Sequence, residues 1–335
     1  MNSSVGQTSI RFPQVSFKTT KQELCQAWAQ RYIRQVDRGN TEPICAVDSR
    51  QEIADKLRQV LRNLSAKAWG KTEELIAKEV IRHQINPGFI DPWAISQDVC
   101  RVYSATLKQY AEGIKAEWFA LDVAQQIGQI RDRYTAHDPR VIGVVSMQFH
   151  YTGQLLLGCT YGNQKAELEP YFKAIDDHLY LPLKRTYEAA AAYEYDALEL
   201  KAIRRLMPAS SQMAVQIVDQ ASIAFPHYHS YSGPLASSLV RISSIRDVEM
   251  FQVYLWVCLL EGNEAIVQQE LFPLCVMLYP VLNVRWELVR YMLILLEHEI
   301  GRRLEPAQWK QFKPHLANLK RMFSTAVFPS QLRFA

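Results

Sequence analysis

The sequence has 335 residues, of which 48% are hydrophobic and 21% are charged, and Lys and Arg exceed Asp and Glu to give a net charge of +4. A chain of this length and composition can bury a core in each of about two domains of ~150 residues, and general disorder is excluded. Only 13 residues are glycine, roughly half of the usual ~7%. This scarcity favours long helices over a turn-rich β fold.

The sequence shows no sign of export or of membrane insertion. No apolar run approaches the ~18 residues that a membrane helix needs, so we expect no membrane span. The start, MNSSVGQTSIRF, has neither a basic nor an apolar segment of the kind found in signal peptides. The six cysteines are scattered and include no CxxC pair, which favours reduced thiols over disulfides or a zinc site. A cytoplasmic protein is therefore predicted.

Helix-start signals organise the first half of the chain. Residues 1–19 are expected to form an irregular arm. Thr20 and Glu23 have the spacing of a capping box, from which a helix should run to about Arg38 before a break at 39–43. Further helices are expected to start at Ser49, at Thr72 and near Asp91, the last continuing with one or more breaks to Tyr134.

The rest of the first half is also predicted to be helical. The apolar stretch 141–159 has the composition of a strand, but helices on both sides favour a buried helix. An amphipathic helix is expected over 171–193, with a kink at Pro182. We therefore predict an all-helical N-terminal domain, residues 20–194, that packs directly against the second half of the chain.

The second half is predicted to be a packed domain of about six helices, residues 195–324, with a tail over 325–335. Segment 198–224 should be helical with a break at Pro208. After a loop to Ser243, a long helix over 245–260 would place Val248 and Phe251 on one buried face. Two more helices are expected over 264–278 and 284–299.

Three blocks of this half carry a family resemblance. The first, 217–234, contains a Phe-Pro turn and a Gly-Pro. The second, Ser244-Ile-Arg246-Asp247, stands where the family has Cys-x-Arg-Asp, and its helix closes with Cys258-Leu-Leu-Glu-Gly262. The third is Leu278-Tyr-Pro-Val-Leu-Asn-Val284. In this order they resemble the phycobiliproteins, the light-harvesting subunits of phycobilisomes, over about 195–300. The resemblance implies a globin-like C-terminal domain.

The sequence departs from the family at the attachment position. The family cysteine forms a thioether bond to a linear tetrapyrrole, whereas this chain has Ser244, and a hydroxyl is a poor nucleophile without an activating base. Cys258 lies too far along the same predicted helix to replace it. Covalent bilin is therefore not expected.

Arg246 and Asp247 remain as candidate contacts to a non-covalent tetrapyrrole. The resemblance implies that the Asp carboxylate accepts hydrogen bonds from pyrrole N–H groups and that the Arg pairs with a propionate, which suits these residue types. The alternative is structural. In that interpretation Asp247 lies at the helix N-terminus, where the dipole favours a carboxylate, and Arg246 forms an ion pair.

Other candidate residues have simpler explanations. His150, in an apolar stretch, could be an axial haem ligand, but a hydrogen-bonded core histidine is the ordinary alternative. His227 and His229 supply only two metal ligands in a turn. Residues 176–178 (Asp-Asp-His) point about 100° apart on a helix. No phosphate loop, nucleophile elbow, HExxH motif or kinase signature is present, so we predict no metal site, no catalytic residue and no enzyme.

Basic residues concentrate at the C-terminal end. From Gly301 onward seven Lys and Arg stand against Glu305 alone, which fits either a solvated helix face or docking to an acidic protein partner. Nucleic acid is not expected, because no basic groove with interleaved aromatic residues accompanies the charges.

The resemblance and the absence of catalytic motifs together favour one function. We expect a non-enzymatic cyanobacterial accessory protein of the phycobilisome, cytoplasmic or peripheral to the thylakoid, that assembles, scaffolds or regulates the antenna and holds no cofactor. One alternative is a sensor or carrier that binds bilin or haem without a covalent bond. A weaker one is an enzyme acting on tetrapyrroles.

Overall fold

Helices make up almost all the regular structure of the computed structural model, which describes residues 19–36 and 47–329. Within these ranges the only strands are β1 (His229–Ser230) and β2 (Gly233–Pro234), which form one antiparallel hairpin. The predicted all-α class is confirmed. The expected arm over 1–18, the break at 39–43 and the last residues of the tail lie outside the described residues.

The first two helices of the chain are long, and their boundaries differ from those predicted. The capping pair of the first helix is Thr19 and Gln22, whose side chains each bond the other's backbone N–H. The separate helix expected at Thr72 is wrong, because one helix runs through this point and the Thr72 hydroxyl donates to the carbonyl of Ala68 (3.0 Å). The helices are α1 (Thr20–Val36), α2 (Val47–Arg82), α3 (Pro92–Ala111), α4 (Ala116–Thr135), α5 (Val141–Leu157), α6 (Asn163–Tyr180) and α7 (Leu183–Ala190), with a 3-10 turn at Pro87–Phe89.

The buried helix predicted over 141–159 is confirmed as α5. The kink expected at Pro182 is a complete break between α6 and α7. The predicted helix over 171–193 is wrong at its end, because α7 stops at Ala190 and turns fill most of the segment before Leu198. The break between α6 and α7 has a simple cause, because Pro182 has no N–H to continue the ladder of helical hydrogen bonds.

The helices of the second half surround one buried helix. They are α8 (Leu198–Leu206), α9 (Ser210–Ala224), α10 (Ser238–Glu261), α11 (Phe272–Val281), α12 (Trp286–Gly301) and α13 (Pro306–Met322), with a 3-10 turn at Met207–Ala209 and a π-helical turn at Val267–Leu271. The break at Pro208 is confirmed. The loop expected up to Ser243 is wrong: α10 starts at Ser238, and the Ser237 hydroxyl accepts from the N–H of Val240 (3.4 Å).

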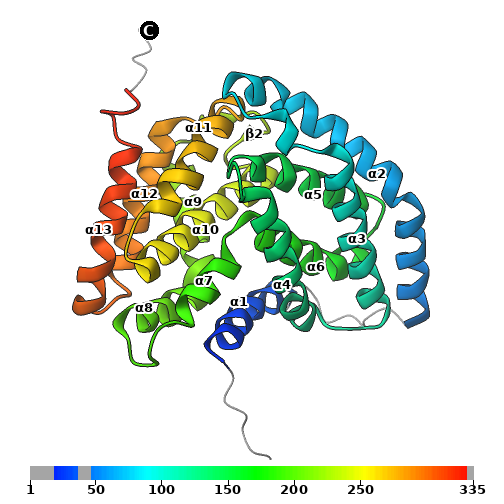
Figure 1. Cartoon of the computed structure of the whole chain (residues 1–335), viewed down its shortest axis with the longest axis horizontal. Coiled ribbons are helices and arrows are strands. Elements are labelled where there is room, and N and C mark those ends of the chain that lie inside the picture. The colour runs from blue at the N-terminus through cyan, green and yellow to red at the C-terminus, as the bar shows by residue number, and fades with distance from the viewer. Residues whose placement is uncertain (1–18, 37–46, 330–335) are drawn as a thin grey trace, which may run out of the picture.

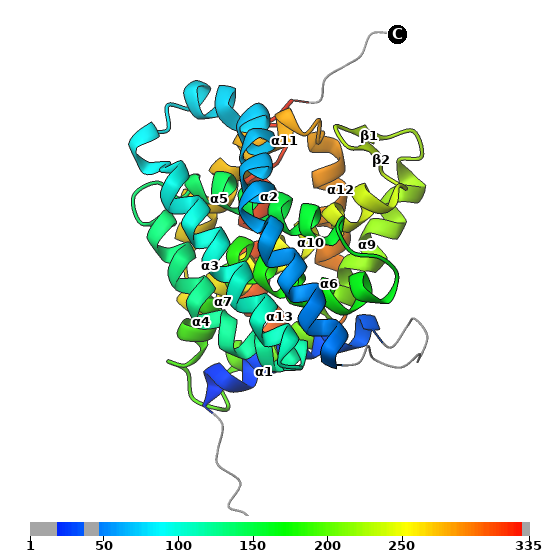
Figure 2. The ribbon, with the colours of Figure 1, turned by 90° about the vertical axis from the view of Figure 1, so that its right-hand side faces the viewer.

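The helix α10 lies at the centre of the molecule. Every residue over 248–260 is buried, so the predicted buried face with Val248 and Phe251 is confirmed, and burial extends all round this part of α10, as in a core helix. Figure 1 shows α9 and α11–α13 on one side and α2–α6 on the other. Figure 2 shows α2 lying across α3 and α5.

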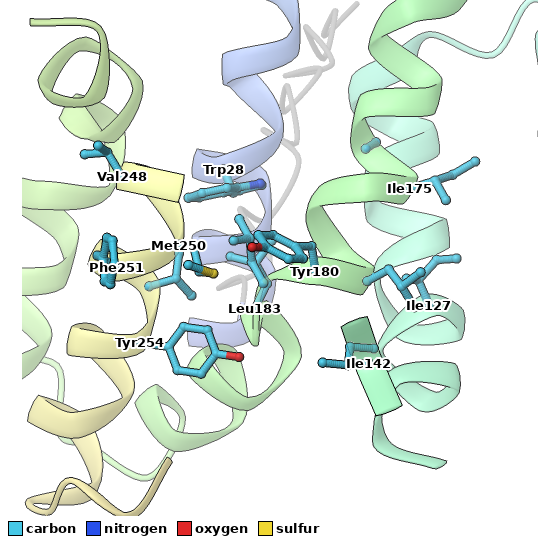
Figure 3. Packing of buried hydrophobic residues seen from close by; sticks show 14 of the residues in the cluster. Trp28, Ile127, Ile142, Ile175, Tyr180, Leu183, Val248, Met250, Phe251 and Tyr254 are labelled. Carbon is cyan, nitrogen blue, oxygen red and sulfur yellow. The ribbon is translucent and has the colours of Figure 1, made fainter. Parts of the chain in front are cut away.

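The two halves share one core. The buried apolar residues form a single cluster with members in every α-helix from α1 to α13. Figure 3 shows part of this cluster. Side chains of α1, of α7 and of the C-terminal end of α6 lie between α10 on one side and the helices α4 and α5 on the other. The labelled residues at this contact are Trp28, Tyr180, Leu183, Met250 and Tyr254.

A buried ion-pair group crosses between the halves near α1. Arg31 on α1 pairs with Glu249 on α10, and the Ser211 hydroxyl on α9 accepts from Arg31 Nε (2.7 Å) and donates to Glu249 (2.8 Å). On α6, Lys173 Nζ lies 2.9 Å from Asp177 and 3.6 Å from Glu249. Two cations and two carboxylates balance here, and such burial is tolerable only when the charges are paired.

A second buried group joins α4 to the π-helical turn. Arg131 pairs with Glu270, and the hydroxyl of Tyr254 on α10 accepts from Arg131 Nη2 (3.0 Å) and donates to the same carboxylate. The side chains of Arg131 and Glu270 are nearly inaccessible. Removing one charge would therefore leave the other unpaired inside the core.

Candidate functional site

A pocket of about 190 Å³ lies where the two halves meet, and we call it the junction pocket. Its walls come from α5 and α6 of the first half and from the hairpin, α10, α11 and α12 of the second. The α10 wall is the N-terminal part of the helix, which is less buried than 248–260. Ser244, Arg246 and Asp247, the three residues singled out from the sequence, all line this pocket.

Arg246 is the unpaired cation of the junction pocket. Its guanidinium lies over the ring of Tyr180, 4.7 Å from the centroid. Its Nε is buried without a hydrogen-bond partner, and within the described ranges no carboxylate lies at ion-pair distance. The structural ion pair considered for Arg246 is therefore not formed. A buried donor left unsatisfied costs about 1–3 kcal/mol, more for a charged group, so an acidic ligand group would be stabilised here.

Asp247 faces two phenols of different helices. The Tyr180 hydroxyl on α6 donates to Oδ1 at 3.4 Å, and Tyr279 on α11 is a second hydrogen-bond partner. Burial raises the pKa of the Asp247 carboxyl to about 6, although Arg246 and both tyrosines act in the opposite direction. Burial also raises the pKa of both tyrosines well above 10, so they stay neutral donors. The alternative that Asp247 lies at the helix N-terminus is wrong, since α10 begins at Ser238.

No cysteine stands at the junction pocket wall. Ser244 provides only a hydroxyl, and Cys258 lies fully buried on α10, about 21 Å further along the helix axis at 1.5 Å per residue. Cys275 on α11 is hydrogen-bonded to Tyr279, and burial raises its pKa far above that of an ordinary thiol. Because the thiolate is the reactive form, neither thiol is available to a ligand in this pocket.

His150 also lines the junction pocket, and its ring is tied to a carboxylate. Its Nδ1 lies 2.8 Å from Asp176 Oδ2, which joins α5 to α6. The hydrogen-bonded alternative thus describes His150, although it is partly accessible rather than a core residue. Sequence reasoning missed Tyr180, Tyr279 and this pairing, because each contact joins residues far apart in the chain.

The remaining histidines show no metal-site geometry. His178 bonds the Ala174 carbonyl through Nδ1 (2.9 Å) and is fully buried. His227 and His229 lie in the exposed hairpin region, with His229 Nδ1 3.3 Å from the carbonyl of His227. Among the residues that the structure describes, no group of three or more His, Cys, Asp or Glu could hold a metal ion.

Three of the basic residues at the C-terminal end are paired with carboxylates that precede it. Glu299 on α12 pairs with Arg302 (2.8 Å) and with Arg303, and Glu297 pairs with Lys320. Both carboxylates come just before Gly301, so the charges counted from Gly301 onward do not include them. Two lysines of α13 remain exposed without an ion pair in the described part of the chain, namely Lys310 and Lys313.

Comparison of the chain with family models, with curated proteins and with solved structures finds no match in any of the three. None of the helices in the described ranges combines the length and apolarity that crossing a membrane requires.

Proposed function

We propose that this protein is a non-enzymatic accessory protein of a light-harvesting antenna that holds an acidic, tetrapyrrole-like ligand in the junction pocket without a covalent bond. The observation that carries the proposal is Arg246, a partly buried cation whose buried Nε has no hydrogen-bond partner, in a pocket between two halves. The resemblance of 195–300 to the phycobiliproteins supplies the ligand class and the setting.

The chemistry of the pocket supports binding rather than attachment or turnover. Arg246 supplies a cation for an acidic group, and Asp247 supplies an acceptor for an N–H group. Ser244 and the buried thiols offer no nucleophile. The same proposal places the protein in the cytoplasm or at the thylakoid surface, with an acidic protein partner that Lys310 and Lys313 would meet.

The size of the junction pocket constrains its ligand. Its volume of about 190 Å³ lies below the ~300–1,000 Å³ usual for drug-sized ligands. A whole tetrapyrrole held by Arg246 in this pocket would therefore extend beyond it.

The test is an absorbance titration of the full chain with biliverdin and with haem, followed by gel filtration and denaturation. We expect a shifted visible band that stays with the folded protein and leaves it on denaturation. Arg246→Gln should weaken binding at least tenfold, because hydrogen bonds to charged groups contribute about 1.5–3 kcal/mol.

Arg185→Gln is the matched control, since Arg185 pairs with Glu261 at the surface and does not line the junction pocket. Equal loss in both variants would indicate general destabilisation instead of a contact. A protein that stays colourless with both ligands would remove tetrapyrrole binding and leave the ligand-free accessory role, to be tested by co-purification with antenna subunits.

A further inference from the structure

A second pocket, of about 380 Å³, adjoins the junction pocket along α10, and we call it the side pocket. Its walls come from α5, α6, α9 and α10. Three residues line both pockets: His150, Ser243 and Arg246. These shared residues, which we call the waist, belong to the walls of both pockets.

Apolar side chains line each pocket besides the waist residues. The junction pocket includes Leu288, Val289 and Met292 of α12. The side pocket includes Phe172 of α6 and Val215 of α9. Apolar surface buried by a ligand contributes about 25 cal/mol per Å², so both ends favour apolar parts of a ligand.

Two carboxylates of the side pocket have partners within the protein. Asp176 is hydrogen-bonded to His150, and Asp177 forms an ion pair with Lys173. Arg241, the other arginine of this wall, pairs with Asp219 (2.8 Å). Glu169 is exposed. Arg246 is thus the cation of both pockets that lacks a carboxylate partner, and it lies at the waist.

We propose that the junction pocket and the side pocket are two arms of one elongated site, which takes an amphipathic molecule with its acidic group near the middle and an apolar part on each side. The acidic group lies against Arg246 at the waist. Together the two arms provide a volume within the usual range for small-molecule sites, which the junction pocket alone does not reach. This inference rests on the proposed function and extends it to the shape of the ligand.

The probe pair is 2-butyloctanoate and dodecanoate, two acids with the same number of carbons. The first carries its carboxylate between two alkyl arms and the second at one end. If both arms are used, the branched acid buries more methylenes, each worth about fourfold in affinity. We expect it to bind at least tenfold more tightly than the straight isomer in calorimetric titrations of the full chain.

Variants that fill one arm separate the alternatives. Val215→Phe narrows the side pocket and should reduce the preference for the branched acid to about threefold or less, while dodecanoate binding stays within twofold. Val60→Phe is the matched control, because Val60 is exposed on α2 and lines neither pocket. Circular dichroism and melting curves establish that each variant is folded.

Four results would overturn the inference. The first is that dodecanoate binds as tightly as the branched acid, and the second is that Val215→Phe leaves the preference for the branched acid unchanged. In either case the pockets act separately and only the two-armed site is wrong. If the neutral amide of the branched acid binds equally well, the acidic group at the waist is wrong. If biliverdin binds and neither alkyl acid does, the ligand class proposed here fails while the proposed function stands.

Discussion

Replacing Asp247 by Asn should stabilise this protein at neutral pH. Burial raises the pKa of this carboxyl from 3.8 to about 6, so the folded state binds the proton more tightly than the unfolded state does. Stability is therefore lost as pH rises between about 4 and 6, and the ionised carboxylate is a net penalty above that window. Asn keeps the shape of the side chain without the charge.

The size of the effect follows from the shift. About two pKa units at ~1.4 kcal/mol each give about 3 kcal/mol, and water in the pocket reduces this toward about 2 kcal/mol. For a chain of this length, an unfolding entropy of ~2 cal/mol/K per residue converts the gain into a rise of about 3–4 °C in Tm. We expect that rise at pH 7.5, and its disappearance by about pH 4, in thermal unfolding followed by circular dichroism.

Asp138→Asn is a control of opposite sign. The Arg140 side chain hydrogen-bonds the Asp138 carboxylate and lowers its pKa. This carboxylate therefore stabilises the fold above its unfolded pKa and loses that effect in acid. The variant should melt at a lower temperature than the parent at pH 7.5. Below about pH 3 the two proteins should melt at the same temperature. The reasoning is refuted if Asp247→Asn melts below the parent at pH 7.5 by an amount that does not change with pH.

Three further changes test the core and the thiols. Glu270→Gln leaves Arg131 uncompensated and should lower the free energy of unfolding by about 3–5 kcal/mol in urea titrations, and an unchanged midpoint would contradict the buried pair. Gly143→Leu should cost at least about 1–3 kcal/mol in the same assay, since even a Cβ there would meet side chains of α11 at 3.0 Å. Gly70→Leu, in open space on α2, is its control. Alkylation by iodoacetamide should modify exposed Cys159 before buried Cys275 in the native protein, and mass spectrometry of tryptic peptides measures the order.

The fold class was predictable because helix signals are local. The apolar run now seen as α5 and the breaks at Pro182 and Pro208 follow from composition and from the missing N–H of proline. The start of α10 was not predictable in this way. The stretch Ser237 to Ser244 is rich in serine, which favours caps and turns over helix interiors, and packing in the pocket wall overrides that preference.

The candidate site was predictable only in part. The family resemblance directed attention to Arg246 and Asp247, and both line the junction pocket. Tyr180 reaches Asp247 across 67 positions of the chain, and Asp176 reaches His150 between two helices. Such partners are fixed by how helices pack, and no periodicity within one helix encodes them.

The place of α1 determines when the centre of this molecule can close during synthesis. Trp28 packs edge-on against Trp256 (6.0 Å), and 218 positions separate Arg31 from its partner Glu249. At ~5–20 residues per second, α1 waits about 10–40 s on the ribosome before α10 is complete. Residues 195–324 expressed alone would present Trp256 to water and leave Glu249 without its guanidinium. The second half of the chain therefore depends on the first helix for its core, and an excised version is expected to aggregate until a peptide covering α1 is supplied.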